Sequence, residues 1–200
     1  MARLFVVRHG NTFDAGDVVT RVGGRTDLPL SKSGWAQAEA LAQHFAGTRF
    51  ALAFHSPLDR TRSTARSILF MRPDWPEIEV KEFLREIDYG PDENQPEEAV
   101  LTRLGAAALE AWDADGTVPP GWIVDPAAIR AGWTSLLADI AELTEDANVL
   151  VVTSNGTARF LPDVVDAAPD GLDRKLKTGA WGEIEVTPAG TRILSWNHRP

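Results

Sequence analysis

The 200-residue sequence contains no cysteine, which excludes disulfide bonds, thiol nucleophiles and zinc sites built on thiolates. No apolar run approaches the roughly 20 residues that a membrane-spanning helix needs. The apolar stretch before Arg8 is too short for a signal peptide. Basic residues are a minority, 20 Lys and Arg against 29 Asp and Glu, which argues against binding to nucleic-acid backbones. The sequence therefore predicts a soluble, cytoplasmic protein.

What is present favours one folded domain spanning residues 1–200. The length lies in the usual range for a single domain, and 44% hydrophobic with 24% charged residues allows a sizeable core. Apolar, β-rich runs alternate with helical patterns. Strands are expected at 4–7, 51–54, 78–80 and 149–153, helices after Ser31 and at 59–70, and a terminal hairpin at 182–187 and 191–196. This alternation predicts a three-layer α/β/α sandwich with a mostly parallel central sheet and the hairpin on one edge.

Between the third and fourth strands lies a long segment without β character. We expect a helical insertion at about residues 91–147, with helices near 97–112 and 126–143. Three of the seven tryptophans, Trp112, Trp122 and Trp133, fall in this segment and are expected to pack in the core. The alternative for Trp122 is that it lines a substrate cleft.

Polar residues follow three of the predicted strands at their carboxyl ends. They are Arg8 and His9 after the first strand, Arg60 shortly after the second, and Ser154 and Asn155 after the fourth. A histidine after a strand is by itself more often structural than catalytic. Because ligands of open α/β sheets bind outside the carboxyl ends of the strands, these side chains are expected to converge. Such a set suits a phosphate pocket that contains a nucleophile.

The motifs around these residues resemble those of the histidine phosphatase superfamily, the phosphoglycerate mutase-like proteins. Five ordered blocks carry the resemblance: 4–12 (LFVVRHGNT), 24–38 with GRTDLPLS at its start, SPLDR at 56–60, Thr64-Ala65, and LREIDYG at 84–90. They cover the first 90 residues well, and the strand at Val149 and the ending at Asn197 match more loosely. The resemblance implies the phosphoglycerate mutase-like α/β/α fold.

The resemblance also implies roles for individual residues. His9 matches the nucleophile that is transiently phosphorylated, Arg8 and Arg60 match the arginines that grip the phosphoryl oxygens, and Glu86 matches the proton donor. Asn11 and Gly24 fall in segments that contact phosphate or substrate. These residue types suit phosphoryl transfer, since arginine keeps its charge and the reaction depends on positioning and charge stabilisation. No metal and no cofactor are expected.

One departure concerns the family's second histidine. In the 153–159 segment, counting back from Arg159 puts Ser154 at its position, whereas counting by the glycine puts Asn155 there. Either residue is a neutral hydrogen-bond donor, and replacing a charged donor costs about 1–3 kcal/mol, a ten- to hundredfold loss of rate. Strand alternation points His55 away from Ser56, so it is a weak substitute. The other two histidines, His44 and His198, are expected on a helix surface and near the terminus.

Two more features of the sequence are unusual for the family. The segment 90–94 lacks the family's usual aromatic, although Glu93 keeps a carboxylate there. Pro162 lies where it should break or restart the helix after the fourth strand.

Three functions remain open at this point. The favoured one is a phosphomonoesterase that forms a phosphohistidine and acts on a small phosphorylated metabolite or a phosphoprotein. A phosphoglycerate mutase-type phosphotransferase is the second, less favoured because the chain ends at Pro200 without a substrate-sealing tail. The third is a non-catalytic binder of phosphate ligands, which the missing histidine makes plausible. No nucleic-acid or membrane partner is expected, and a homodimer is compatible with the sequence.

Overall fold

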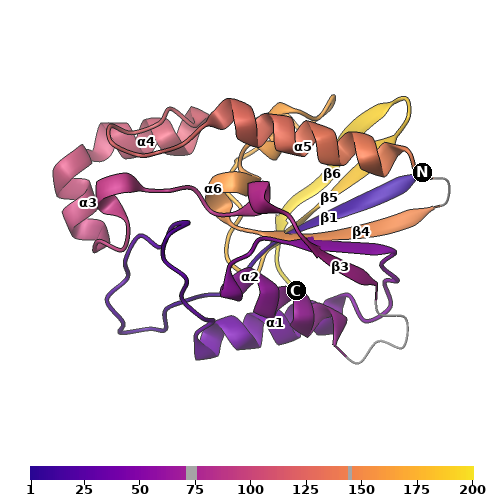
Figure 1. Ribbon diagram of the computed structural model, residues 1–200, viewed down its shortest axis with the longest axis horizontal. Coiled ribbons are helices and arrows are strands. Elements are labelled where there is room, and N and C mark those ends of the chain that lie inside the picture. The colour runs from indigo at the N-terminus through magenta and orange to yellow at the C-terminus, as the bar shows by residue number, and fades with distance from the viewer. Residues whose placement is uncertain (71–75, 144–145) are drawn as a thin grey trace.

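A six-stranded sheet forms the centre of the molecule (Figure 1). The computed structural model describes residues 1–70, 76–143 and 146–200. The strand order is β3-β2-β4-β1-β5-β6. The strands are β1 (Ala2–Arg8), β2 (Leu52–His55), β3 (Glu77–Val80), β4 (Ala147–Thr153), β5 (Trp181–Thr187) and β6 (Gly190–His198). The first four are parallel, and the β5–β6 hairpin joins β1 antiparallel, so the predicted edge hairpin is confirmed.

Helices cover both faces of the sheet, as Figure 1 shows, which confirms the predicted α/β layers. Helices α1 (Lys32–His44) and α2 (Asp59–Leu69) lie on one face and α5 (Pro126–Ala141) on the other. Helices α3 (Glu97–Leu104) and α4 (Ala106–Asp115) extend past the carboxyl end of β1. The shorter elements are α6 (Asn155–Ala158) and the 3₁₀ turns η1 (Glu82–Leu84), η2 (Gly90–Asp92) and η3 (Leu161–Asp163).

The two covered faces explain why β1 is a continuous apolar run. Leu4 and Val6 belong to the core under α5, which includes Trp133, whereas Phe5 and Val7 belong to the core under α1 and α2. Because alternate side chains point to opposite faces, every position from 4 to 7 has to be apolar. Burying each such side chain stabilises the fold by about 1.5–3 kcal/mol. The central strand that carries Arg8 and His9 is thereby held firmly in place.

The structure differs from the sequence-based expectation at one helix and agrees with it at another. The single helix expected near 97–112 is two helices, because Gly105 leaves the helical conformation with φ 79° and ψ 159°. The helix after β4 ends after four residues, and Pro162 is the second residue of the η3 turn that follows, so the predicted break is confirmed. Glycine adopts such a positive φ without strain, and proline cannot donate the hydrogen bond that would continue a helix.

The three tryptophans of the 91–147 segment are buried in the core, as predicted. Trp122 donates from Nε1 to the Asp92 carboxylate at 2.7 Å, and Trp133 donates to the Thr157 carbonyl at 3.0 Å. Their polar atoms are satisfied, so they pack the helices α4 and α5 without cost. No helix in the described part of the chain is long and apolar enough to cross a membrane.

Candidate active site

His9 lies directly after β1 and is 5% exposed. Its Nδ1 is 2.7 Å from the Gly10 carbonyl oxygen, and its Nε2 is 3.2 Å from Nε of Arg60. Since the guanidinium can only donate, Nε2 must accept, and the ring proton must lie on Nδ1. Burial, followed by the charges of Arg60 and Arg8, holds the pKa of His9 well below 6.5. The ring is therefore neutral near pH 7, and its Nε2 lone pair accepts from Arg60.

Arg60 lies in the first turn of α2 and is 1% exposed. Two backbone carbonyls hold its guanidinium, the Thr26 oxygen at 2.8 Å and the Gly23 oxygen at 3.1 Å. Both belong to the glycine-containing loop that precedes α1. Glu93 fixes this loop in turn, because its carboxylate accepts from the Arg25 amide at 2.9 Å. The loop thus aims Arg60 at His9 rather than at solvent.

Arg8 is positioned from the opposite side. Its Nη1 donates to the Leu176 carbonyl at 2.9 Å, while its buried Nε has no hydrogen-bond partner among the described residues. Asn155 holds the same segment, since its Oδ1 accepts from the Leu176 amide at 2.8 Å. Burial lowers the pKa of Arg8, yet the guanidinium stays charged near neutral pH. A buried cation with an unused donor is suited to an anionic ligand.

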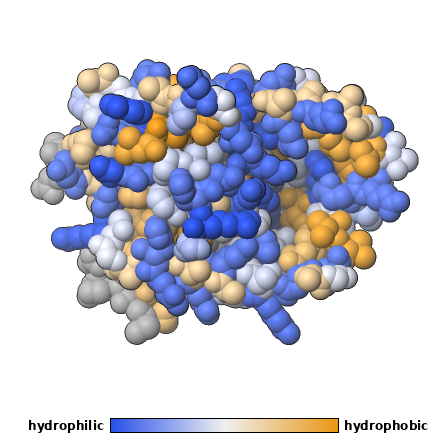
Figure 2. All heavy atoms as spheres, turned by 180° about the vertical axis from the view of Figure 1, so that it is seen from behind, coloured by the Kyte–Doolittle hydropathy of each residue, from blue (hydrophilic) through white to orange (hydrophobic). Residues whose placement is uncertain are grey.

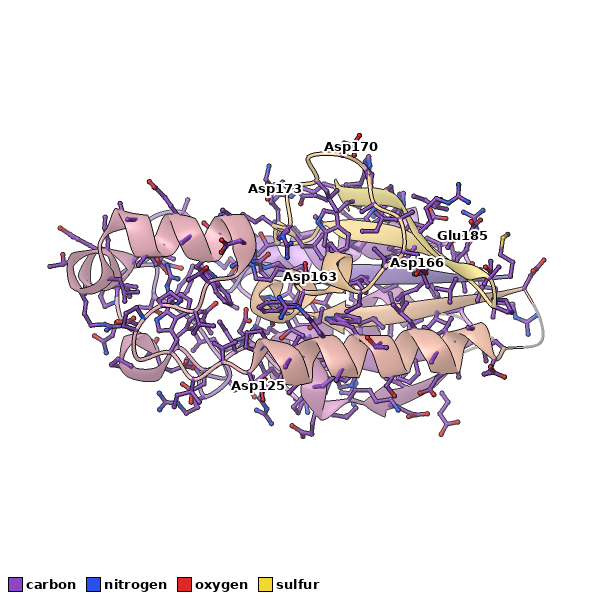
Figure 3. All side chains as sticks on the ribbon, turned by 90° about the horizontal axis from the view of Figure 1, so that it is seen from above. Asp125, Asp163, Asp166, Asp170, Asp173 and Glu185 are labelled. Carbon is purple, nitrogen blue, oxygen red and sulfur yellow. The ribbon has the colours of Figure 1, made fainter. Side chains whose placement is uncertain are left out.

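The segment between η3 and β5, which carries Leu176, is fastened by aspartates at its start (Figure 3). Asp163 accepts from Arg130 of α5 at 2.8 Å and also pairs with Arg174. Asp166 accepts from the Thr191 amide of β6 at 2.7 Å. Figure 3 shows the two aspartates beside α5 and the hairpin, respectively. These contacts connect Arg8 to elements far along the chain.

Glu86 is 6% exposed and follows η1. Its Oε1 accepts from the Ile87 amide at 2.9 Å, and the Gly156 amide also hydrogen-bonds the carboxyl. Burial raises the pKa of Glu86 above 4.5, against the opposing charges of Arg60 and Arg8. A Cβ at position 156 would lie 2.1 Å from Oε1, so only glycine allows this approach. The Glu86 carboxyl therefore keeps its proton to a higher pH than an exposed glutamate does.

These side chains meet at a cavity of about 310 Å³. Six of the eight residues predicted for the site line it: Arg8, His9, Asn11, Arg60, Glu86 and Asn155. Gly24 does not line the cavity, and its amide donates to the Ile87 carbonyl at 2.8 Å. Ser154 is not among the lining residues either. Within the described ranges, no group of three or more His, Asp or Glu side chains could hold a metal ion.

The structure separates the two candidates for the missing histidine. Asn155 opens α6 and lines the cavity, with Oδ1 engaged by Leu176. Ser154 is fully buried, and its Oγ has no hydrogen-bond partner in the part of the chain that the structure describes. Asn155 can therefore offer its amide NH₂ to a ligand in the cavity, while Ser154 has an unused hydroxyl behind it.

None of the other histidines lines the cavity. The ring of His55 is buried, with Nδ1 2.5 Å from the Ser56 carbonyl oxygen, and His44 is exposed on α1 beside Trp181. His198 is at the end of β6, 5.8 Å from the Trp181 ring. Trp122 is likewise absent from the wall, so its expected core role holds and the cleft alternative does not.

Several lining residues were not foreseen from the sequence. Arg21, Tyr89 and Glu97 are the ones with ionisable side chains, and the wall is completed by Thr12, Phe13, Val19, Thr20, Val22 and Thr178. Figure 2 shows a mainly hydrophilic face with hydrophobic patches at its upper left and along its right side. No motif marks Arg21 or Glu97, because they are 76 residues apart and meet only in the folded chain.

Residues 4–199 match the family model of the histidine phosphatase superfamily (branch 1). A 2,3-bisphosphoglycerate-dependent phosphoglycerate mutase 2 of Gloeobacter violaceus is 30% identical over 179 residues, which are 87% of this chain and 80% of that one. The mouse fructose-2,6-bisphosphatase TIGAR is 36% identical over 121 residues, 59% of this chain and 43% of its own.

Solved structures show the same fold. Bacillus stearothermophilus YhfR superimposes with a TM-score of 0.79 at 22% identity, covering 100% of this chain and 98% of the other. A mycobacterial glucosyl-3-phosphoglycerate phosphatase in complex with VO3 gives a TM-score of 0.78 at 23% identity, covering 98% of both chains. At these identities the likeness concerns the fold alone.

Proposed function

The chain belongs to the histidine phosphatase superfamily, and on that premise we propose that it hydrolyses phosphomonoesters through a phosphohistidine on His9. The orientation of His9 is the single observation that carries the proposal. Its Nδ1 is engaged by the Gly10 carbonyl, so the basic Nε2 faces the cavity beside Arg60. A neutral imidazole held in this tautomer is prepared for attack on phosphorus.

The first step forms the His9 Nε2–phosphorus bond and breaks the ester bond between phosphorus and the leaving oxygen. Arg8 and Arg60 stabilise the charge on the phosphoryl oxygens, and the incoming anion replaces His9 as the acceptor for Nε of Arg60. Glu86 gives its proton to the leaving oxygen, a role that its raised pKa supports.

In the second step water attacks the phosphohistidine. The Glu86 carboxylate takes a proton from this water, the phosphorus–nitrogen bond breaks, and inorganic phosphate leaves with its negative charge. Neutral His9 and protonated Glu86 are restored, so the cycle closes without another reactant.

We favour a small phosphorylated metabolite as substrate, because the cavity encloses only about 310 Å³, at the lower end of ligand sites. A phosphoprotein is the alternative. The cytoplasmic location, the lack of a metal requirement and a homodimer stay predictions of the sequence.

A mutase is the second candidate function, since the Gloeobacter violaceus relative carries that name at 30% identity. A mutase would return the phosphoryl group from His9 to a bound product rather than to water. Incubation with 3-phosphoglycerate and its bisphosphate separates the two: a mutase interconverts phosphoglycerates, whereas a phosphatase releases inorganic phosphate.

The central test is release of phosphate from p-nitrophenyl phosphate and glycerol 3-phosphate. We expect His9→Ala to abolish turnover while the circular dichroism spectrum stays native. His44→Ala, an exposed histidine on α1, is the matched control and should keep full activity. Mass spectrometry of the rapidly quenched wild-type protein should find one phosphoryl group on His9. Activity retained in His9→Ala would refute the mechanism, and a folded wild type that binds vanadate without turning over any ester would favour the non-catalytic binder.

A further inference from the structure

The outer wall of the cavity holds an ion pair that the proposed chemistry does not use. Glu97, the first residue of α3, faces Arg21 from the loop before α1, and both line the cavity. Nε of Arg21 donates to Oε1 of Glu97 at 3.1 Å, and Nη2 pairs with Oε2. This two-point geometry aligns the flat guanidinium with the carboxylate.

The pair is fixed from both sides. The Arg21 amide donates to the Gln95 carbonyl at 2.9 Å, and the Glu97 amide donates to the Val19 carbonyl at 3.3 Å. The guanidinium carbon also lies 5.4 Å from the Tyr89 ring centre and 5.1 Å from that of Trp122. With its side chain only 16% exposed, Arg21 has little freedom to turn toward a ligand.

The charges of the described lining residues divide the cavity into two parts. Arg8 and Arg60 flank His9 and face the phosphoryl group. The remaining lining cation is Arg21, whose charge Glu97 balances. Any substrate group beyond the phosphoryl group therefore meets a wall with no net positive charge.

The rest of that wall is neutral. It consists of hydroxyl-bearing and apolar side chains: Thr12, Phe13, Val19, Thr20, Val22, Tyr89 and Thr178. Hydroxyls can bind alcohol groups, and the apolar side chains can cover carbon. Neither supplies the positive charge that would offset the desolvation of a second anion.

Resting on the proposed phosphatase function, we propose that the Arg21–Glu97 pair selects phosphomonoesters whose leaving group carries no second anionic group. A carboxylate or second phosphate at this wall would lie beside the Glu97 carboxylate, which already holds Nε and Nη2 of Arg21 and balances its charge. An uncharged, hydroxylated or apolar leaving group would meet no such penalty. Glu97 is thus a specificity-determining residue.

Glycerol 3-phosphate and 3-phosphoglycerate form a matched pair of probes, because they share a three-carbon skeleton and differ by a hydroxymethyl group against a carboxylate. We expect the wild type to favour glycerol 3-phosphate in kcat/KM by about tenfold or more, as like charges brought together in a site repel. Equal kcat/KM for the two esters would overturn the proposal.

Glu97→Gln tests the pair directly, since the amide keeps the size of the side chain and frees the charge of Arg21. The ratio of kcat/KM for 3-phosphoglycerate to that for glycerol 3-phosphate should rise by about tenfold, the worth of one hydrogen bond to a charged group. Glu98→Gln makes the same change in net charge next door, outside this cavity wall, and should leave the ratio unchanged. Equal ratios in the two variants would refute the role of Glu97.

The double variant R21Q/E97Q identifies the cation. If freed Arg21 receives the carboxylate, the double variant should lose most of the gain, and a gain kept in full would overturn this assignment. Failure of the phosphatase proposal would look different: neither ester would be hydrolysed by any variant. The selectivity can then still be measured by calorimetry, as the ratio of the dissociation constants of the two esters. The same preference in the wild type and the same change in Glu97→Gln are expected, and their absence would overturn the proposal.

Discussion

Replacing Glu86 by glutamine should slow hydrolysis by an amount that depends on the leaving group. Glutamine has the same shape, and its Oε1 can still accept from the Ile87 amide that now lies 2.9 Å from the carboxylate. What is lost is the proton donor. General acid catalysis contributes about 10²–10⁴ in rate. We therefore expect kcat for glycerol 3-phosphate to fall by about that factor, or about 3–5 kcal/mol of barrier.

The p-nitrophenolate ion leaves without protonation, so the first step with p-nitrophenyl phosphate should slow by less than about tenfold. Stopped-flow measurement of nitrophenolate release reads this step alone, before the water step that also uses Glu86. Glu82→Gln, on the exposed η1 turn of the same segment, serves as the control and should leave both rates unchanged. Equal losses for the two esters in Glu86→Gln would show that the carboxyl does not act as the acid.

The pH profile provides an independent reading of the same group. Burial holds the pKa of His9 well below 6.5, so the rate should rise with pH as the ring loses its proton on the acid side. Burial raises the pKa of Glu86 above 4.5. The rate should therefore fall as the pH rises through this raised pKa, because the proton donor is lost. The ionisation of the substrate is common to both proteins. The falling limb that disappears in Glu86→Gln therefore belongs to Glu86, and its persistence would contradict the assignment.

Three further substitutions test the remaining parts of the site. Arg60→Ala should weaken vanadate binding, measured by calorimetry, by about tenfold or more, because a charge-assisted donor is worth about 1.5–3 kcal/mol. Arg66→Ala, on the exposed side of α2, should leave this affinity unchanged. Asn155→Ala should lower kcat/KM about tenfold while Ser154→Ala lowers it less, and the reverse order would make Ser154 the counterpart of the second histidine. Gly156→Ala should displace the Glu86 carboxyl, because the added Cβ would lie 2.1 Å from Oε1. It should therefore reduce turnover of glycerol 3-phosphate without changing vanadate affinity. An unaffected rate would show that the backbone shifts to make room for the methyl group.

The sequence predicted the elements that depend on local patterns. The apolar run of β1 and the spacing on α1 identify their elements without further information. Either Ser31 or Ser33 could cap α1 by sequence, and Ser31 is the cap, accepting from the Gly34 amide at 3.2 Å. The break at Gly105 was missed, because the apolar pattern continues through it and a single glycine is often tolerated inside a helix.

The site could be predicted where residues follow strand ends, and the family resemblance added Asn11 and Glu86. His9 and Arg60 could be placed because the sheet brings such positions to one edge. Arg21 and Glu97 could not, since their encounter depends on how the loop before α1 lies against α3. The choice between Ser154 and Asn155 was open for a related reason: it depends on how sharply the chain turns from β4 into α6, which counting residues does not show.

The position of β1 in the sheet has a consequence for how the chain folds during synthesis. Ala2 pairs with Ala147 on one side and with Val186 on the other, so both neighbours of this central strand lie far along the chain. At about 5–20 residues per second, the ribosome needs roughly 7–30 s after making β1 to produce β4. Through that interval an apolar strand remains with both edges unpaired, a state prone to association with other chains. Native pairing of this sheet is therefore dominated by long-range contacts, and we expect it to form slowly. Phosphate binding by Arg8 and His9 should consequently appear late in refolding, together with closure of the β5–β6 hairpin onto β1.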